Sequence, residues 1–182
     1  PEENISGILG GTLSPDMGEI AFSTNYESNN LYAETLYLTL GKELYGDDLS
    51  AHKAMVSALA ELSAAAGSKK TDGGDVSITD GSGLSRQNLL SPTFLCAFLN
   101  AMKKSPEYGT FVESLPYPGS EGTMTGVMTD YGYEYMSRIK LKSGSMTGVK
   151  CFSGYVIPAD GDLSGAAVFS IMINNSTLSQ YR

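Results

Sequence analysis

The segment from Lys142 to Val149 constrains the fold most, because strand-like sequence lies on both sides of it. It reads Lys-Ser-Gly-Ser-Met-Thr-Gly-Val, and apolar runs follow at residues 156–157 and 166–173. Strand-like segments before and after the glycine-containing segment predict the edge of an antiparallel sheet. Gly144 has no Cβ, so a substrate backbone could lie close against that edge.

The same segment carries groups that suit an anion. Lys142 offers a fixed positive charge, while Ser143 and Ser145 offer hydroxyl donors. An edge with these groups fits an extended peptide that ends in a carboxylate and binds by strand addition. A Lys-Ser-Gly triplet alone does not establish a site, since short motifs recur by chance.

Composition limits the class of protein. The chain has 182 residues, 41% hydrophobic and 18% charged, which fits one globular domain or a large part of one. Twelve basic against twenty acidic residues give a net charge of −8, which argues against a nucleic-acid partner. No apolar run approaches the ~18 residues of a transmembrane segment, and no signal peptide is visible. The start at Pro1 without a methionine suggests a processed or trimmed fragment.

Metal and redox chemistry have little support in the sequence. Cys96 and Cys151 are the only cysteines and form no Cys-x-x-Cys pair, and Cys96 is expected to be a buried apolar residue. His52 is the only histidine. A zinc site or a Ser-His-Asp triad within this chain is therefore excluded, and we expect no metal or other cofactor.

The order of the patterns predicts an α+β fold, with helices first and strands last. The helical region is expected at about 14–115 and the strands at about 133–174. A short strand is also expected at 76–79. The predicted helices cover residues 16–25, 31 to Gly41 or soon after, 47–67, 91–102 and 107–115, and strand sequence is expected at 133–136 and 139–141.

Two polar stretches lie among the predicted helices. Ser28-Asn29-Asn30 falls in a break between two helices, where a hydroxyl and an amide could relay a proton and hold a carbonyl, or where Ser28 or Asn29 could simply cap the next helix. The stretch 80–86, Asp-Gly-Ser-Gly-Leu-Ser-Arg, lacks the pattern of a phosphate-binding loop. It predicts a tight turn in which Asp80 caps backbone N–H groups.

Together these stretches resemble one family. Ser28-Asn29-Asn30 and Lys142-Ser143-Gly144 match the second and third motifs of penicillin-binding proteins and serine β-lactamases. The surrounding words at 25–31, 80–86, 115–124 and 142–156, in this order, resemble the D-alanyl-D-alanine carboxypeptidase/endopeptidase family of low-molecular-mass penicillin-binding proteins (peptidase family S13). The resemblance covers nearly the whole chain, and it implies part of an α/β/α sandwich of the penicillin-binding, serine β-lactamase-like transpeptidase type.

The resemblance implies a penicillin-sensitive serine enzyme that cleaves D-Ala-D-Ala peptides of peptidoglycan, outside the cytoplasmic membrane. Ser28 would pass a proton to the leaving amine, Asn30 would hold the substrate carbonyl, and Lys142 would tune that relay. Ser143 and Ser145 would bind the terminal carboxylate beside Gly144, and the Ser145 N–H would form half of the oxyanion hole. Ser143 replaces the usual threonine and keeps its hydroxyl.

The first family motif, Ser-x-x-Lys, is missing from its usual place ahead of the Ser-x-Asn motif. Ser50 to Lys53 and Ser137 to Lys140 both spell it, but both follow the Ser-x-Asn motif instead of preceding it. Ser50 fits a helix cap, and Ser137 falls in a predicted strand, where Lys140 would face away. We therefore expect the nucleophile to lie upstream of Pro1. On that expectation 1–182 is the C-terminal part of a transpeptidase-like domain, is inactive alone, and packs on the N-terminal part of its own protein.

Three other interpretations remain at this point. A serine β-lactamase shares the second and third motifs, although the words around Asp80 and Leu115 favour the peptidase. A non-catalytic peptidoglycan-binding module would keep the cleft and lack the nucleophile. The simplest interpretation is an α+β domain whose motifs are coincidental.

Overall fold

The computed structural model of the chain describes residues 11–46 and 76–176, together with residues 53, 57, 58, 60, 61 and 64. The isolated residues from 53 to 64 are all helical, and the ends of the helix expected at 47–67 lie outside the described residues. The other elements, in chain order, are α1 (Met17–Asn25), α2 (Asn30–Tyr45), β1 (Val76–Ser77), β2 (Leu89–Leu90), α4 (Pro92–Met102), α5 (Tyr108–Ser114), the 3-10 helix η2 (Gly122–Met124), α6 (Tyr133–Met136), β3 (Ile139–Met146), β4 (Val149–Val156), the 3-10 helix η3 (Leu163–Gly165) and β5 (Ala167–Ile173).

Strands β3, β4 and β5 form an antiparallel meander in that order, as the sequence predicts. Met146 pairs with Val149, so β3 and β4 are joined by a two-residue turn. Gly148 lies in this turn at φ +80°, a conformation that costs glycine little and other residues more. The close pairing places Lys142 opposite Ser153 and Gly144 opposite Cys151.

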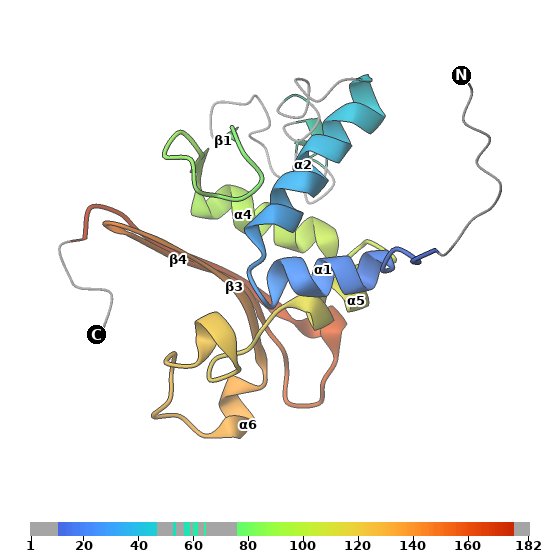
Figure 1. Cartoon of the computed structure of the whole chain (residues 1–182). Coiled ribbons are helices and arrows are strands. Elements are labelled where there is room, and N and C mark those ends of the chain that lie inside the picture. The colour runs from blue at the N-terminus through green and yellow to red at the C-terminus, as the bar shows by residue number, and fades with distance from the viewer. Residues whose placement is uncertain are drawn as a thin grey trace, which may run out of the picture.

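The helices α1, α2, α4 and α5 lie on one side of the sheet, and the segment that contains α6 lies on the other (Figure 1). Local signals explain where these helices begin. Asp16 and Glu19 form a reciprocal capping box at the start of α1, and Ser91 caps α4 with Pro92 in its first turn. Helix α1 packs against both α5 and α2, and α4 packs against β5 and β4.

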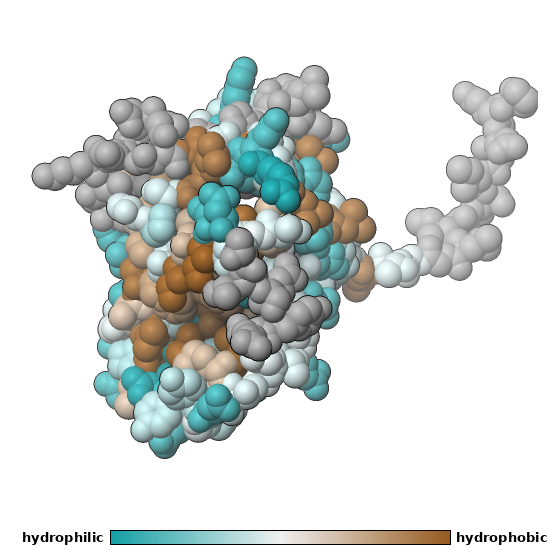
Figure 2. Space-filling view, turned by 90° about the vertical axis from the view of Figure 1, so that its left-hand side faces the viewer, coloured by the Kyte–Doolittle hydropathy of each residue, from teal (hydrophilic) through white to brown (hydrophobic). Residues whose placement is uncertain are grey.

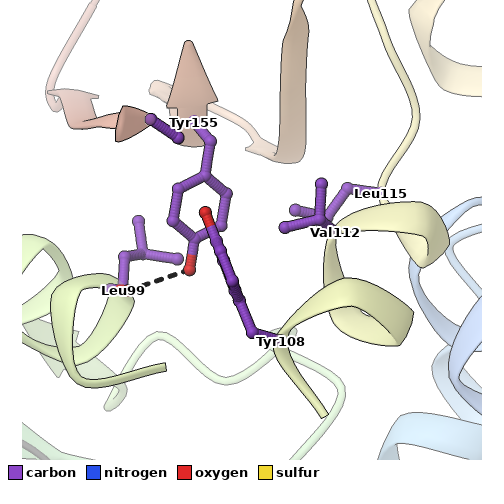
Figure 3. Close-up of a cluster of buried hydrophobic side chains, with 6 residues drawn as sticks. Leu99, Tyr108, Val112, Leu115 and Tyr155 are labelled. Atoms are coloured by element: carbon purple, nitrogen blue, oxygen red, sulfur yellow. Dashed lines mark hydrogen bonds between the residues drawn. The ribbon is translucent and has the colours of Figure 1, made fainter. Parts of the chain in front are cut away.

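Tyr155 joins the sheet to the helices. Its side chain is fully buried, its ring lies 5.3 Å from that of Tyr108, and its hydroxyl donates to the Leu99 carbonyl of α4 at 2.9 Å (Figure 3). Val112 and Leu115 belong to the same buried cluster. Burial raises the pKa of the Tyr155 hydroxyl, so this group stays a neutral donor.

The opposite face of the sheet is apolar and open. A hollow of about 320 Å³ lies between this face and the segment after η2, and hydrophobic side chains of the face remain exposed, among them Ile171 at 51% and Ile173 at 48%. Figure 2 shows hydrophobic side chains gathered between hydrophilic ones on one side of the molecule. An apolar face of the sheet is therefore exposed in the described part of the chain.

Two expectations on local structure are wrong. Residues 133–136 form the short helix α6, not a strand, and Ser137 ends that helix. Strand β3 does not stop at Leu141 but continues through Lys142 to Met146, so only Thr147 and Gly148 form the turn. Helix α2 passes through the buried Gly41 and ends soon after it, at Tyr45, where Gly46 forms a left-handed cap at φ +82°.

Tyr155 gives a test of how the layers are held. We expect Tyr155→Ala to lower the free energy of unfolding by about 3–5 kcal/mol, because it leaves a cavity. Tyr155→Phe should lower it by about 1 kcal/mol, because one buried hydrogen bond is lost. Tyr131→Phe, at a side chain that is 59% exposed, is the matched control and should change it by less than about 0.5 kcal/mol. Equal urea midpoints for Tyr155→Phe and Tyr131→Phe would contradict this view of the core.

Candidate active site

The site centres on a hydrogen bond between two distant segments. The ammonium of Lys142, on β3, donates to the Ser28 Oγ at 2.8 Å, and 114 positions separate the two residues. The same Nζ donates to the carbonyl of Ser143 at 2.9 Å. The fold therefore brings together the second and third motifs recognised in the sequence.

Ser28 sits in the short connection between α1 and α2. Its φ is +58°, in the left-handed region that disfavours a side chain, at a cost of order 1 kcal/mol. The connection is held from both ends. The Asn29 side chain accepts from the Tyr32 N–H and caps α2, and the Asn29 N–H donates to the Ser23 carbonyl. Asn29, not Ser28, is thus the cap, and the Ser28 hydroxyl remains available to Lys142.

Lys142 is held in an unusual electrostatic setting. Both acceptors of its Nζ are uncharged oxygens, and no carboxylate of the described residues is paired with it. Burial lowers the pKa of its ammonium below the usual range, because desolvation disfavours the charged form. A partly desolvated cation beside a hydroxyl interacts with it more strongly than it would in water.

Strand β3 presents an open edge beside this pair. The Leu141 N–H points away from β4, because it donates to the Pro116 carbonyl at 2.9 Å. In an antiparallel strand the backbone groups of alternate residues face the same side. The Ser143 carbonyl, which accepts from Lys142, faces that side too, and the Ser145 N–H follows two residues later. Within the described residues no other strand pairs with this edge of β3.

Two cavities meet at Gly144. One of about 350 Å³ lies behind Lys142 and is lined by Asn25, Ser143 and Gly144, with apolar side chains of α4 and α5. The other, of about 510 Å³, runs from Gly144, Ser145 and Met146 toward Arg86. A Cβ on Gly144 would meet only the Cys151 Cβ, at an ordinary 3.8 Å. Packing among the described residues therefore does not require a glycine at this position.

The expected site residues divide into two groups. Ser28 and Lys142 are in direct contact, and Ser143 and Gly144 line the same cavity as Lys142. Asn30 is the first residue of α2 and is exposed, and Ser145 is exposed on the open edge. Ser50 and His52 lie outside the described residues.

The turn at Asp80 behaves as expected and also braces α2. The Asp80 carboxylate accepts from the N–H groups of Gly83 and Ser85, and these bonds, with one from the Asn88 side chain, lower its pKa despite the opposing effect of burial. The Glu34 side chain of α2 accepts from the N–H groups of Gly81 and Ser82. A Cβ at Gly81 would lie 2.5 Å from the Ala33 carbonyl oxygen, so only glycine fits. The sequence did not reveal this bracing.

Two absences hold for the described part of the chain. Its residues contain no group of three or more His, Cys, Asp or Glu side chains arranged to hold a metal ion. None of the helices described there is both long and apolar enough to span a bilayer.

Comparisons with known proteins find relatives along most of the chain. Over 172 residues the chain is 30% identical to the D-alanyl-D-alanine carboxypeptidase of Actinomadura sp. (strain R39), a match that covers 92% of this chain and 30% of that protein. It is 28% identical over 180 residues to carboxypeptidase DacB of Mycolicibacterium smegmatis, a match that covers 94% of this chain and 37% of the relative.

Solved structures share the fold. Penicillin binding protein 4 (dacB) from Haemophilus influenzae superposes with a TM-score of 0.70 at 25% identity, covering 90% of this chain and 35% of that one. The same protein complexed with a novel β-lactam gives a TM-score of 0.72 at 24% identity, with 88% and 36% covered. The chain thus spans about a third of the length of these relatives. Because the model of the D-Ala-D-Ala carboxypeptidase 3 (S13) family matches residues 6–182, the chain belongs to that family.

Proposed function

We propose that the protein to which this chain belongs is a penicillin-sensitive serine D-Ala-D-Ala carboxypeptidase or endopeptidase that acts on peptidoglycan peptides. The observation that carries the proposal is the hydrogen bond from Lys142 to Ser28 at the open edge of β3. Family membership and the names of the curated relatives support it. On this proposal the enzyme acts at the cell wall, outside the cytoplasmic membrane.

The proposed roles follow from the contacts. Lys142 donates to the Ser28 oxygen, so the Ser28 proton is free to pass to another group. The charge of Lys142 favours developing negative charge on Ser28 and helps attract a substrate carboxylate. Asn30, two residues on and exposed, would hold the amide carbonyl of the substrate. Ser143 and Ser145 would bind the terminal carboxylate, while Gly144 lets the peptide lie against the strand.

The reaction is an acyl transfer in two steps. A serine of a Ser-x-x-Lys motif outside residues 1–182 attacks the carbonyl carbon between the two D-alanines. Its hydroxyl proton passes to the lysine of that motif, which returns a proton by way of Ser28, and the Ser145 N–H stabilises the oxyanion. The C–N bond then breaks, and the leaving amine takes a proton through Ser28. Water later attacks the acyl-enzyme, which releases the shortened peptide and restores the serine hydroxyl. A β-lactam acylates the same serine, and the acyl-enzyme persists.

The apolar face of the sheet fits the same proposal. Its exposed side chains, Ile171 and Ile173 among them, would be covered by other parts of the protein, since the chain spans only part of its relatives. We propose that this contact completes the domain on the open face. The nucleophile would reach the cavity behind Lys142, about 350 Å³ in volume, from the other side of the sheet, which the helices cover.

Intact mass after incubation with benzylpenicillin tests the proposed function. We expect a stable adduct on the full-length protein and none on residues 1–182, because the nucleophile is supplied from elsewhere. An adduct on residues 1–182 would show that a serine within them is the nucleophile and that the assignment of roles is wrong. If neither forms an adduct, antibiotic consumption by the full-length protein would indicate a β-lactamase, and its absence a non-catalytic module.

Lys142→Met separates catalysis from folding. Methionine keeps much of the length of the side chain and removes the charge, so we expect acylation by benzylpenicillin to fall by about 10²–10³-fold. The free energy of unfolding should stay the same or rise, because a desolvated cation without a carboxylate partner opposes folding. Urea unfolding and the acylation rate are measured on one preparation. A variant that loses stability and keeps its rate would contradict the proposed role.

The pH dependence follows from the lowered pKa of Lys142. The charged form is present below the folded-state pKa and is lost above it, so acylation should decline on the basic side below the usual lysine value of 10.5. The free energy of unfolding should change in the opposite direction and increase with pH. The unfolded chain binds the proton more tightly, so unfolding free energy gains from this group as pH rises through the same window. Acylation rates and urea midpoints from pH 7 to 11 check both signs, and a basic limb retained in Lys142→Met would exclude Lys142 as its cause.

A further inference from the structure

A chain of hydrogen bonds lies beside the Ser28–Lys142 pair, and the family motifs do not include it. The Asn25 side-chain amide donates to the Ser114 hydroxyl at 2.7 Å. That hydroxyl donates in turn to the Phe111 carbonyl at 2.7 Å. Ser114 is only 2% exposed, while Asn25 is half-buried, so both bonds are partly shielded from water. Donors aligned head to tail in a buried setting strengthen one another.

Asn25 and Ser114 each lie close to the candidate site. Asn25 is the last residue of α1, three residues before Ser28, and it lines the cavity behind Lys142. Ser114 is the last residue of α5, and the two residues after it contact β3. The Leu115 carbonyl accepts from the Lys140 ammonium at 3.3 Å, and the Pro116 carbonyl accepts from the Leu141 N–H at 2.9 Å.

Three consecutive residues therefore join the two halves of the site. We call residues 114–116 the clamp: Ser114 holds the helix end that leads to Ser28, while Leu115 and Pro116 hold the strand that carries Lys142. Pro116 itself is fully buried. A serine with φ +58° needs such support, because the connection around it would otherwise relax to a more ordinary conformation.

We propose that Asn25 is a positioning residue that, through Ser114 and the clamp, fixes the Ser28 hydroxyl against the Lys142 ammonium. It touches no reacting atom. Its effect on acylation rests on the proposed function, and its effect on Lys142 does not.

The test uses the full-length protein with Asn25→Leu, which keeps the size of the side chain and removes its donor. Ser114→Ala, which only removes an oxygen, is the second variant in case the first does not fold. Ser23→Ala is the matched control, because it removes a hydrogen bond of α1, from Ser23 Oγ to Glu27, that does not reach the clamp. Labelling of Lys142 by acetic anhydride, followed by peptide mass spectrometry over a range of pH, reports the pKa of this lysine without any activity.

We expect the pKa of Lys142 to rise toward 10.5 in Asn25→Leu and Ser114→Ala, because water reaches the ammonium once Ser28 moves away. Acylation by benzylpenicillin should fall by about 10–100-fold, as for a misplacement of about 1 Å. The double variant should resemble either single variant, because both remove one contact. The control should leave both quantities unchanged.

A purely structural role would lower the unfolding midpoint and leave the pKa of Lys142 as in the parent protein, and this result would overturn the proposal. If the parent protein is not acylated at all, the proposed function fails, yet the labelling still decides the role of Asn25. An unchanged pKa in folded Ser114→Ala is sufficient to reject it.

Discussion

The site depends on the burial of Tyr155 between the sheet and the helices. Its hydroxyl binds the carbonyl of Leu99, and its ring packs against Tyr108, so β4 cannot slide along α4. The antiparallel register then places Lys142 opposite Ser153, two positions from Tyr155 along β4. A register shift of one residue would turn the lysine to the open apolar face and empty the site. Core packing and the geometry of the candidate site thus share one constraint.

The Ser28–Lys142 pair is poorly explained by stability alone. Among the described residues Lys142 is desolvated without a carboxylate partner, Ser28 holds a left-handed conformation, and β3 is an edge strand. Each of these features opposes folding or invites association. Their concentration at one place is typical of a functional site, where local strain is maintained by the surrounding structure. Here that support comes from the Asn29 cap, the Asp80 turn against α2 and the clamp at 114–116.

Sequence patterns predicted the fold well where the signal is local. Ser91-Pro92 marks the start of α4, and the alternating apolar runs mark the meander. The predictions failed where contacts between separate segments of the chain determine the local structure. Residues 133–136 alternate like a strand but form one helical turn, in which Tyr133 packs its ring against Tyr117. The end of α2, by contrast, was predicted at Gly41 or soon after, and the helix ends at Tyr45, where the left-handed Gly46 caps it.

The residues of the candidate site were also predicted only in part from the sequence. Resemblance to the family selected Ser28 and Lys142, and the structure places them in contact. Nothing local pointed to Ser114, because its partner Asn25 lies 89 positions away and an asparagine at a helix end usually serves only as a cap or turn residue. The sequence did not point to Glu34 either. The two backbone N–H groups that donate to its side chain belong to Gly81 and Ser82, which are far from it in the sequence.

The most direct measurement of the central claim is release of D-alanine from a peptide that ends in D-Ala-D-Ala. It compares the full-length protein with Ser28→Ala and with the control Ser23→Ala. The account predicts release by the parent and the control, and a fall of about 10²–10⁴-fold in Ser28→Ala, because proton transfer to the leaving amine is lost. Equal rates in the parent and Ser28→Ala would contradict it.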